Sequence, residues 1–549
     1  MGSEMCIRDR EIIVKYSGSL ESIRNRYNVY IKELLNYYAI IVADKATIEL
    51  ISQEDVIDYV EKPKSLYYQI ERTKTAACVG SVRADGNILS GKGVIVGVID
   101  TGIDIFDNAF RNSDGTTRIL NIYDQTTGEK YDKQSIDEYI RLNEDLSGGT
   151  FSYDNAPGVD NIMHGTDVSY IAAGSLGVAY EADIIAVKMG YSINNQFPRT
   201  TSLMDAIDYI IRKAIEYRKP VAVNISYGCN YGAHNGNTLL ESFIDDISKS
   251  YRCVICVGSG NEADKAIHFG GIINTGQVQT AYLSVGEYQS AIDIQIWKNY
   301  WDTIDVMLIN PRGEQIGIIT EGRINRYETY NTEIITLLGE PSPYNIYQEI
   351  YINLIPKTDY ILSGIWQIVL MAGSIRAGEY NIWLPSSQAL GYATAFNNPT
   401  ADGTITIPAT ARNCIAVGAY NAYTNSYAAF SGRGFDNSIR NVNAGVKPDI
   451  TAPGVDISIA RQRGNDITYR NVTGTSYAVP VVTGAAALLM QWGIVMGNDR
   501  FMYGEKLKAA LIDGSKPVGL VGITRNDNQP DPRTGWGAVC LKNTLNKIL

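Results

Sequence analysis

Four short segments of this chain are almost wholly apolar and rich in β-branched residues, and they restrict its fold more than any other feature. They are residues 94–100, 184–187, 221–226 and 254–257, and helical patterns such as residues 203–217 lie between them. A strand that is apolar on both faces must be covered on both faces. The alternation therefore predicts an α/β fold, in which a parallel sheet lies between two layers of helices.

The pattern of apolar and turn residues changes along the 549 residues of the chain, which predicts more than one domain. Residues 88–268 and 399–549 share the α/β pattern. Residues 269–398 instead contain many short alternating strands with recurring turn residues, and helical periodicity is nearly absent. The simplest interpretation is one α/β domain interrupted by an inserted β-sandwich or jelly roll.

The N-terminal part of the chain has a third residue pattern, which differs from both of these. Residues 1–10 are unlike the residues after them and are interpreted as a leader or sequence scar. Residues 11–70 predict a small α+β unit, with strands at 11–15, 38–42 and 45–51, a helix at 20–27 and a short helix opening at 52–56. Residues 71–87 are polar and poorly patterned, and they predict a linker.

The seven cysteines are irregularly spaced, and their odd number argues against a disulfide framework. Cys253 and Cys256 form a C-x-x-C inside an apolar strand. Side chains at i and i+3 of a strand point to opposite faces, so this pair is not expected to share a metal or a disulfide. No Asp-rich loop dictates a calcium site, and we predict no metal and no cofactor.

Charge and hydropathy limit the class of partner. The formal net charge is −11, which argues against nucleic acid or an anionic membrane surface as the main partner. No uninterrupted apolar run of about 18 residues is present, so no membrane span is expected. No secretory signal is visible either.

Three short motifs place an acid, a histidine and a serine in settings that suit acyl transfer. Asp100 ends an apolar strand, and the active sites of open parallel sheets lie at that edge. His164 begins a small-residue helix, and Ser476 precedes a long apolar helix whose first turn is expected to hold Pro480. A serine hydroxyl needs a base to attack, and a buried carboxylate orients a histidine for that task. Only three histidines are present, and only His164 has this context.

Each motif alone has a simpler interpretation. An Asp before Thr-Gly is often a turn former, a lone His at a helix start can cap or pack, and Gly-Thr-Ser is common in loops. Their joint occurrence in the order Asp, His, Ser is far more specific than any one of them. The set predicts a catalytic triad of Asp100, His164 and Ser476.

The motifs resemble those of the subtilisin-like, or subtilase, family. The matching stretches are Asp100-Thr-Gly-Ile, His164-Gly-Thr and Gly474-Thr-Ser-Tyr-Ala-Val-Pro480, flanked by similar stretches at residues 177–188 and 447–454. The resemblance implies a subtilisin-like fold and serine endopeptidase activity.

Two positions depart from the family pattern. The family often has a second His where this chain has Asp167, and often a Met where it has Tyr477. Neither position transfers the proton, so altered packing or subsite shape is expected rather than lost activity.

The resemblance also implies an oxyanion site and a substrate cleft. Asn261, in a Gly-rich loop, resembles the family's oxyanion amide, with the Ser476 backbone N–H as the second donor; a plain turn residue is the alternative for Asn261. An extended substrate would bind by strand addition, with an S1 pocket between the two segments. These segments are Ser226, Tyr227 and Gly228, and Gly258, Ser259 and Gly260.

The layout as a whole is similar to the Csp germination proteases of clostridia. Asn261 and Ser476 are much farther apart than in compact subtilases, and the β-rich segment accounts for the excess. The resemblance implies that the N-terminal unit is a prodomain that assists folding and inhibits, with self-cleavage near Gln69. A permanent structural domain is the alternative.

The Csp resemblance also implies partners and a location. The partners are a protein or peptide substrate, such as a spore cortex-hydrolase zymogen, and the chain's own prodomain. The expected location is the bacterial cytoplasm or the spore, with release by other routes left open. The alternative function is a catalytically silent pseudoprotease that acts as a binding or regulatory protein. The inserted β-domain is expected to be a rigidifying clamp rather than a carbohydrate-binding module.

Overall fold

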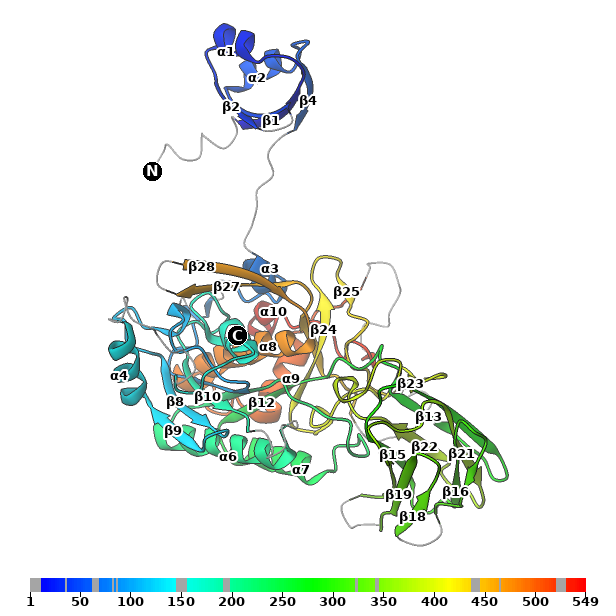
Figure 1. Cartoon of the computed structure of the whole chain (residues 1–549). Helices are drawn as coiled ribbons and strands as arrows, with labels where there is room; N and C mark the ends of the chain where they lie inside the picture. The colour runs from blue at the N-terminus through cyan, green and yellow to red at the C-terminus, as the bar shows by residue number, and fades with distance from the viewer. Residues whose placement is uncertain are drawn as a thin grey trace. The chain divides into compact units, whose positions relative to one another are not determined.

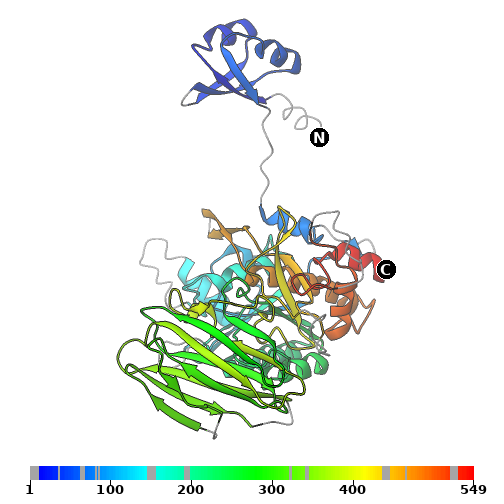
Figure 2. The ribbon, with the colours of Figure 1, turned by 90° about the vertical axis from the view of Figure 1, so that its right-hand side faces the viewer.

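The chain divides into two compact units, Met1–Tyr68 and Gln69–Leu549. The computed structural model, drawn from two directions in Figures 1 and 2, describes residues 11–34, 37–61, 69–80, 83–84, 87–144, 156–190, 198–320, 324–340, 345–435, 445–463, 466–519 and 530–549. The expected leader, residues 1–10, lies outside the described residues.

The first unit is a four-stranded antiparallel sheet in the order β2-β3-β1-β4, with two helices. Its elements are β1 (Glu11–Tyr16), α1 (Glu21–Tyr27), β2 (Tyr30–Leu34), β3 (Tyr38–Val42), α2 (Lys45–Ile51) and β4 (Ile57–Glu61). Buried aliphatic side chains of the sheet and of both helices, among them Val14, Ile23 and Ile51, form its core. The expected α+β character is confirmed.

Two expectations for this unit were wrong. Residues 45–51 form helix α2 rather than a strand, because Asp44 is extended and its side chain accepts the backbone N–H of Thr47 at 3.0 Å, as an N-cap does. The helix expected to open at Ser52 is absent, since residues 52–56 form turns. Ser52 instead ends α2, with its N–H bonded to the carbonyl of Ile48.

The second unit is built on a nine-stranded, mostly parallel sheet in the order β25-β24-β12-β11-β7-β10-β8-β9, with β26 paired to β24. The strands are β7 (Ile95–Asp100), β8 (Ile119–Asp124), β9 (Glu129–Asp132), β10 (Asp183–Lys188), β11 (Val221–Ile225), β12 (Cys253–Gly258), β24 (Ile415–Asn421), β25 (Ser426–Tyr427) and β26 (Ile450–Pro453). The four apolar runs of the sequence are thus β7, β10, β11 and β12, which neighbour one another in parallel.

Helices cover both faces of this sheet, as predicted. One face packs against α5 and α8, and the other against α6 and α7. The helices are α3 (Gln69–Ala76), α4 (Lys133–Glu144), α5 (His164–Ala173), α6 (Thr200–Tyr217), α7 (Leu239–Ser250), α8 (Thr475–Met490), α9 (Gly504–Asp513) and α10 (Leu541–Ile548). Cys253 and Cys256 belong to the cores on opposite faces, as their spacing predicted.

Helix α8 is the central helix of the domain. Within the described part of the chain, Thr475–Val495 is the single helical segment long and apolar enough to cross a membrane, but 89% of its most apolar stretch is buried inside the protein. That burial is what a core helix requires.

The stretch expected to be a linker is largely structured. Residues 69–76 form α3, which packs beside the strand β27 (Ile457–Arg463), and Ala77 and Val79 enter the core of the second unit. Cys78 forms a disulfide with Cys540, just before α10. This disulfide, which the irregular cysteine spacing did not predict, joins the beginning of the second unit to its end.

The inserted segment is a sandwich of two antiparallel sheets around its own core, as expected. The six-stranded sheet contains β13 (His268–Ile272), β22 (Glu379–Trp383), β15 (Ile292–Asn299), β20 (Tyr347–Pro356), β19 (Thr332–Leu338) and β18 (Ile324–Glu328). The five-stranded sheet contains β17 (Gln315–Ile316), β16 (Ile304–Ile309), β21 (Gly364–Ala372), β14 (Val278–Val285) and β23 (Ala395–Phe396).

A stack of three rings joins the sandwich to the α/β domain. Trp383 lies between His234 and His268, with ring centroids 4.1 and 4.9 Å away, and its indole N–H donates to the carbonyl of Gly403 at 2.9 Å. Trp383 is 1% exposed. The stack therefore fixes the junction at a buried point.

We expect Trp383→Ala to lower the free energy of unfolding by about 3–5 kcal/mol, because it leaves a cavity between two buried imidazoles. The apparent melting temperature of the purified protein measures the effect. Trp301→Ala, at a residue that is 49% exposed, is the control and should change stability far less. An unchanged melting temperature for Trp383→Ala would refute the view that the sandwich acts as a clamp.

Candidate active site

A buried carboxylate and a histidine meet at the carboxyl edge of the sheet. Asp100 is the last residue of β7 and is 1% exposed, and its Oδ1 lies 2.6 Å from Nδ1 of His164, the first residue of α5. The same oxygen accepts the backbone N–H of Thr101 at 2.8 Å. The second ring nitrogen of His164, Nε2, is not used by Asp100.

The first turn of α5 packs very closely on the loop after β7. A Cβ on Gly165 would lie 2.3 Å from the carbonyl oxygen of Gly102 and 3.0 Å from Cβ of Asp100. Any side chain at this position would push the helix away from the strand. Gly165 therefore permits the short contact between His164 and Asp100.

Asp160, which no sequence motif revealed, and Thr101, the residue after Asp100, hold this helix start in place. The buried carboxylate of Asp160 accepts the hydroxyl of Thr101 at 2.7 Å and the backbone N–H groups of Met163 and Thr166 at 2.7 and 2.8 Å. The Thr101 hydroxyl in turn accepts the N–H of Gly165 at 2.9 Å. An acid just before a helical pattern is a capping signal, and it could have identified Asp160.

The environment favours the charged form of His164. Burial alone lowers the pKa of His164, but the facing carboxylate of Asp100 outweighs it, with smaller contributions from Asp160 and Asp167, so the pKa is raised above 6.5. By contrast, burial lowers the pKa of His234 to about 4.

Ser476 is the second residue of α8 and is half-buried. Pro480 was expected in the first turn of α8 but lies just beyond it, and it has no N–H to offer the carbonyl of Ser476. The hydroxyl of Ser226 donates to that carbonyl instead, at 3.3 Å. The ring of Tyr477, the next residue, has its centroid 5.3 Å from that of His164. The helix start that carries Ser476 thus lies beside the imidazole.

Asn261 lies at the same helix start. Its side-chain oxygen accepts the backbone N–H and the hydroxyl of Thr475, at 3.0 and 3.1 Å. Because the oxygen is engaged, the amide nitrogen remains as a donor, and it lies near Gly474. This orientation suits a donor to an oxyanion formed next to Ser476.

The two segments expected to wall the substrate pocket face a common residue. A Cβ on Gly228 would lie 2.5 Å from Oγ1 of Thr406, and a Cβ on Gly260 would lie 2.5 Å from its Cγ2. Thr406 is buried, and its backbone N–H donates to the carbonyl of Ser259 at 3.0 Å. No motif of the sequence marks Thr406, because it comes after the insert and is far from either segment along the chain.

The remaining residues of these segments have varied surroundings. Ser226 and Tyr227 are half-buried, and Gly258 ends β12 in a fully buried strand. Ser259 is buried, with its hydroxyl 3.3 Å from that of Ser431.

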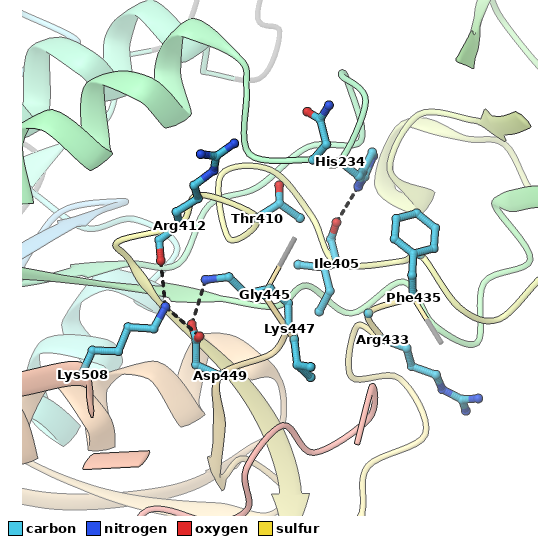
Figure 3. Close-up of a pocket in the computed structure, with 14 residues that line it drawn as sticks. His234, Ile405, Thr410, Arg412, Arg433, Phe435, Gly445, Lys447, Asp449 and Lys508 are labelled. Carbon is cyan, nitrogen blue, oxygen red and sulfur yellow. Dashed lines mark hydrogen bonds and ion pairs between the residues drawn. The ribbon is translucent and has the colours of Figure 1, made fainter. Parts of the chain in front are cut away.

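A separate cavity of about 320 Å³ lies beside the segment that holds Thr406. Ile405 lines it, and none of the residues proposed above for catalysis does. Figure 3 shows Lys447 and Lys508 directed at the carboxylate of Asp449, at 2.8 and 2.7 Å. Because its lining includes none of the candidate catalytic residues, the cavity is distinct from the candidate active site.

Across the described ranges, no group of three or more His, Cys, Asp or Glu side chains is placed to hold a metal ion. Cys229, Cys253, Cys256 and Cys414 are free thiols.

Comparison with known proteins gives a consistent result. The subtilase family pattern matches residues 91–341 and 377–537, and the Csp protease B prodomain pattern matches residues 2–64, which includes part of the expected leader. The solved structure of the Clostridium perfringens CspB protease aligns with this one with a TM-score of 0.78 and 34% sequence identity. The alignment covers 87% of this chain and 97% of the chain of that protease.

More distant relatives align over shorter stretches. A subtilase-type proteinase of Saccharomyces cerevisiae is 33% identical over 128 residues, which are 23% of each chain. The subtilisin-like protease 10 of Arthroderma otae is 34% identical over 120 residues, which are 22% of this chain and 27% of that protein. The chain thus spans about a quarter of the length of these curated relatives.

We expect NMR of histidine-labelled protein to separate these imidazoles by their titration. The pKa of His164 should lie above 6.5 and that of His234 near 4. Asp100→Asn should move the titration of His164 to lower pH, because it removes the charge that stabilises the imidazolium, and should leave His234 unchanged. A titration of His164 that is unchanged in Asp100→Asn would contradict the pairing of Asp100 with His164.

Proposed function

The chain belongs to the subtilase family, within its Csp subgroup, and from this premise we propose that it is a serine endopeptidase with Asp100, His164 and Ser476 as its catalytic triad. The observation that carries the proposal is the convergence at one sheet edge. The Asp100–His164 hydrogen bond is 2.6 Å long, and the imidazole lies beside the helix start that bears Ser476.

The proposed reaction is acyl transfer. Nε2 of His164 takes the proton of the Ser476 hydroxyl as its oxygen attacks the scissile carbonyl, and the imidazolium then protonates the leaving amine. Asp100 holds Nδ1–H and stabilises the imidazolium. The amide of Asn261 and the backbone N–H of Ser476 donate to the oxyanion. Water then releases the acyl group from Ser476 by the same proton transfers.

The proposed substrate is an extended segment of a protein. Ser226–Gly228 and Gly258–Gly260 would bind its backbone by strand addition, with Thr406 at the floor of the S1 pocket between them. Because Thr406 fills the space beside both glycines, the pocket favours a small or narrow side chain. A zymogen such as a spore cortex hydrolase fits the Csp resemblance as the physiological target.

The N-terminal unit is proposed to be a prodomain removed by the enzyme itself. The pattern match to residues 2–64 and the boundary between the two units at Tyr68 and Gln69 support cleavage near Gln69. Gln69 is the first residue of α3, and residues 66–68 lie outside the described residues. The Cys78–Cys540 disulfide would keep the new N-terminal stretch attached to the enzyme.

We expect the wild-type protein to be recovered as two fragments separated near Gln69, and Ser476→Ala to remain one chain. Intact-mass measurement and N-terminal sequencing identify the cut. A fluorophosphonate probe should label the wild type and not Ser476→Ala. A wild type that stays uncut and unlabelled, even after removal of the prodomain by another protease, would favour a binding or regulatory protein instead.

We also expect the acid limb of the kcat/KM profile to lie above pH 6.5. The base must be neutral to accept a proton, and the raised pKa of His164 keeps it protonated to higher pH than an ordinary histidine. Hydrolysis of a chromogenic peptide between pH 5 and 9 measures this, with constant ionic strength. A limb centred well below 6.5 would contradict the assignment of His164 as the base.

A further inference from the structure

Asp167 and Tyr477, the two departures from the subtilase motifs, both lie near His164. Asp167 is in the first turn of α5, three residues after His164, and is fully buried. Tyr477 places its ring beside that of His164, with a centroid distance of 5.3 Å. The helix that begins with His164 and the helix that carries Ser476 thus each contribute one of these residues.

A two-stranded ribbon supplies two arginines to the buried carboxylate. The strands are β27 and β28 (Asp466–Val472), and Figure 1 shows the ribbon beside α3. Ile459 pairs with Arg470 and Arg461 with Thr468, so Arg461 and Arg470 are diagonal neighbours on one face. Both can therefore reach the same side chain.

The contacts of these arginines are specific. Nε of Arg461 donates to Oδ1 of Asp167 at 2.9 Å, and its Nη2 donates to the carbonyl of Met163 at 2.8 Å. Nη2 of Arg470 forms an ion pair with Oδ2 of Asp167 at 2.6 Å. Burial raises the pKa of Tyr477, and the positive charge of Arg470 partly opposes that rise, which places Arg470 near the Tyr477 hydroxyl. One arginine is therefore close to both unusual residues.

We propose that Asp167, Arg470 and Tyr477 form a positioning unit that holds the ring of His164 toward Ser476, with Arg461 anchoring the unit to the ribbon. The inference rests on the proposed protease function. Asp100 fixes one ring nitrogen, Tyr477 restrains the ring face, and Arg461 fixes the carbonyl that precedes His164. The unit leaves the ring one orientation from which Nε2 can receive a proton.

The unit also sets the charge around the imidazole. Asp167 favours the imidazolium, whereas two guanidinium groups without their carboxylate would oppose it. Asp100, Asp160 and Asp167 act on His164 directly, and the ring of Tyr477 lies beside it. Arg461 and Arg470 act on the carboxylate of Asp167. Removal of one charge therefore moves the titration of His164 in a direction fixed by its sign.

The test compares the processed wild type with Asp167→Asn, Arg470→Met and Tyr477→Phe on one chromogenic peptide. Each should lower kcat by about tenfold or more with little change in KM, since misplacement of a catalytic group by about 1 Å can cost about a hundredfold in rate. The acid limb of kcat/KM should move to lower pH in Asp167→Asn and to higher pH in Arg470→Met. Tyr477→Phe, which keeps the charges, should not move it.

Arg326→Met is the matched control, because Arg326 pairs with Glu333 across a hairpin of the inserted domain at 2.9 Å. It should keep wild-type kcat and the wild-type pH profile. A merely structural role would lower stability without opposite shifts of the acid limb. If Asp167→Asn fails to fold, Arg470→Met still tests the positioning unit. The Arg470 side chain is 43% exposed, so its replacement is expected to leave the fold intact.

The outcomes distinguish the positioning unit from the proposed protease mechanism on which it rests. Wild-type kcat and acid limb in both Asp167→Asn and Arg470→Met, with an inactive Ser476→Ala, would overturn the positioning unit alone. Full activity in Ser476→Ala would instead overturn the proposed protease mechanism. Opposite shifts of the acid limb together with lowered kcat would establish the unit.

Discussion

The hydrogen bond between Asp100 and His164 is the contact on which the rest of the site depends. It links the end of a central buried strand to the start of a helix, so its length is set by how closely α5 packs on β7. A small residue at Gly165 permits that approach, and Asp160 binds the helix start to the loop after the strand. A carboxylate buried so completely needs a fixed partner, which ties its burial to the orientation of the imidazole.

The inserted sandwich is part of the same construction, although it has a separate core. The carboxylate of Glu262, the residue after Asn261, is buried and accepts the backbone N–H of Ser387 from the insert at 3.0 Å. Tyr231, after the other substrate segment, bonds to Asp293 of the insert at 3.1 Å. The loops that would bind substrate and oxyanion are therefore braced from the insert as well as from the sheet. The inserted domain would act as a clamp through these hydrogen bonds, because loops that are already held in place lose less conformational entropy when substrate binds.

The sequence predicted those features whose signal is local. The apolar runs identified the parallel strands, and the order of three motifs identified the Asp100–His164 pair that the structure brings together. Helix α2 was mistaken for a strand because Thr47, Ile48 and Ile51 are β-branched, while the decisive interaction is a single cap from Asp44. Cys78 and Cys540 are 462 positions apart, and Thr406 is separated from its glycine neighbours by the whole insert. Such pairs are visible only once the chain is folded.

The same limit explains why Asp167 and Tyr477 looked like two unrelated and harmless departures. A carboxylate at position 167 has no exposure at all, so without cations it would be costly to bury. Tyr477 is 8% exposed, and its hydroxyl likewise needs a partner. Arg470, which is remote from Asp167 in sequence, pairs with that carboxylate and places its charge near the Tyr477 hydroxyl, and it does so from a ribbon outside the central sheet. Asp167, Arg470 and Tyr477 therefore depend on one another, and their effect on the orientation of the His164 ring is a joint effect.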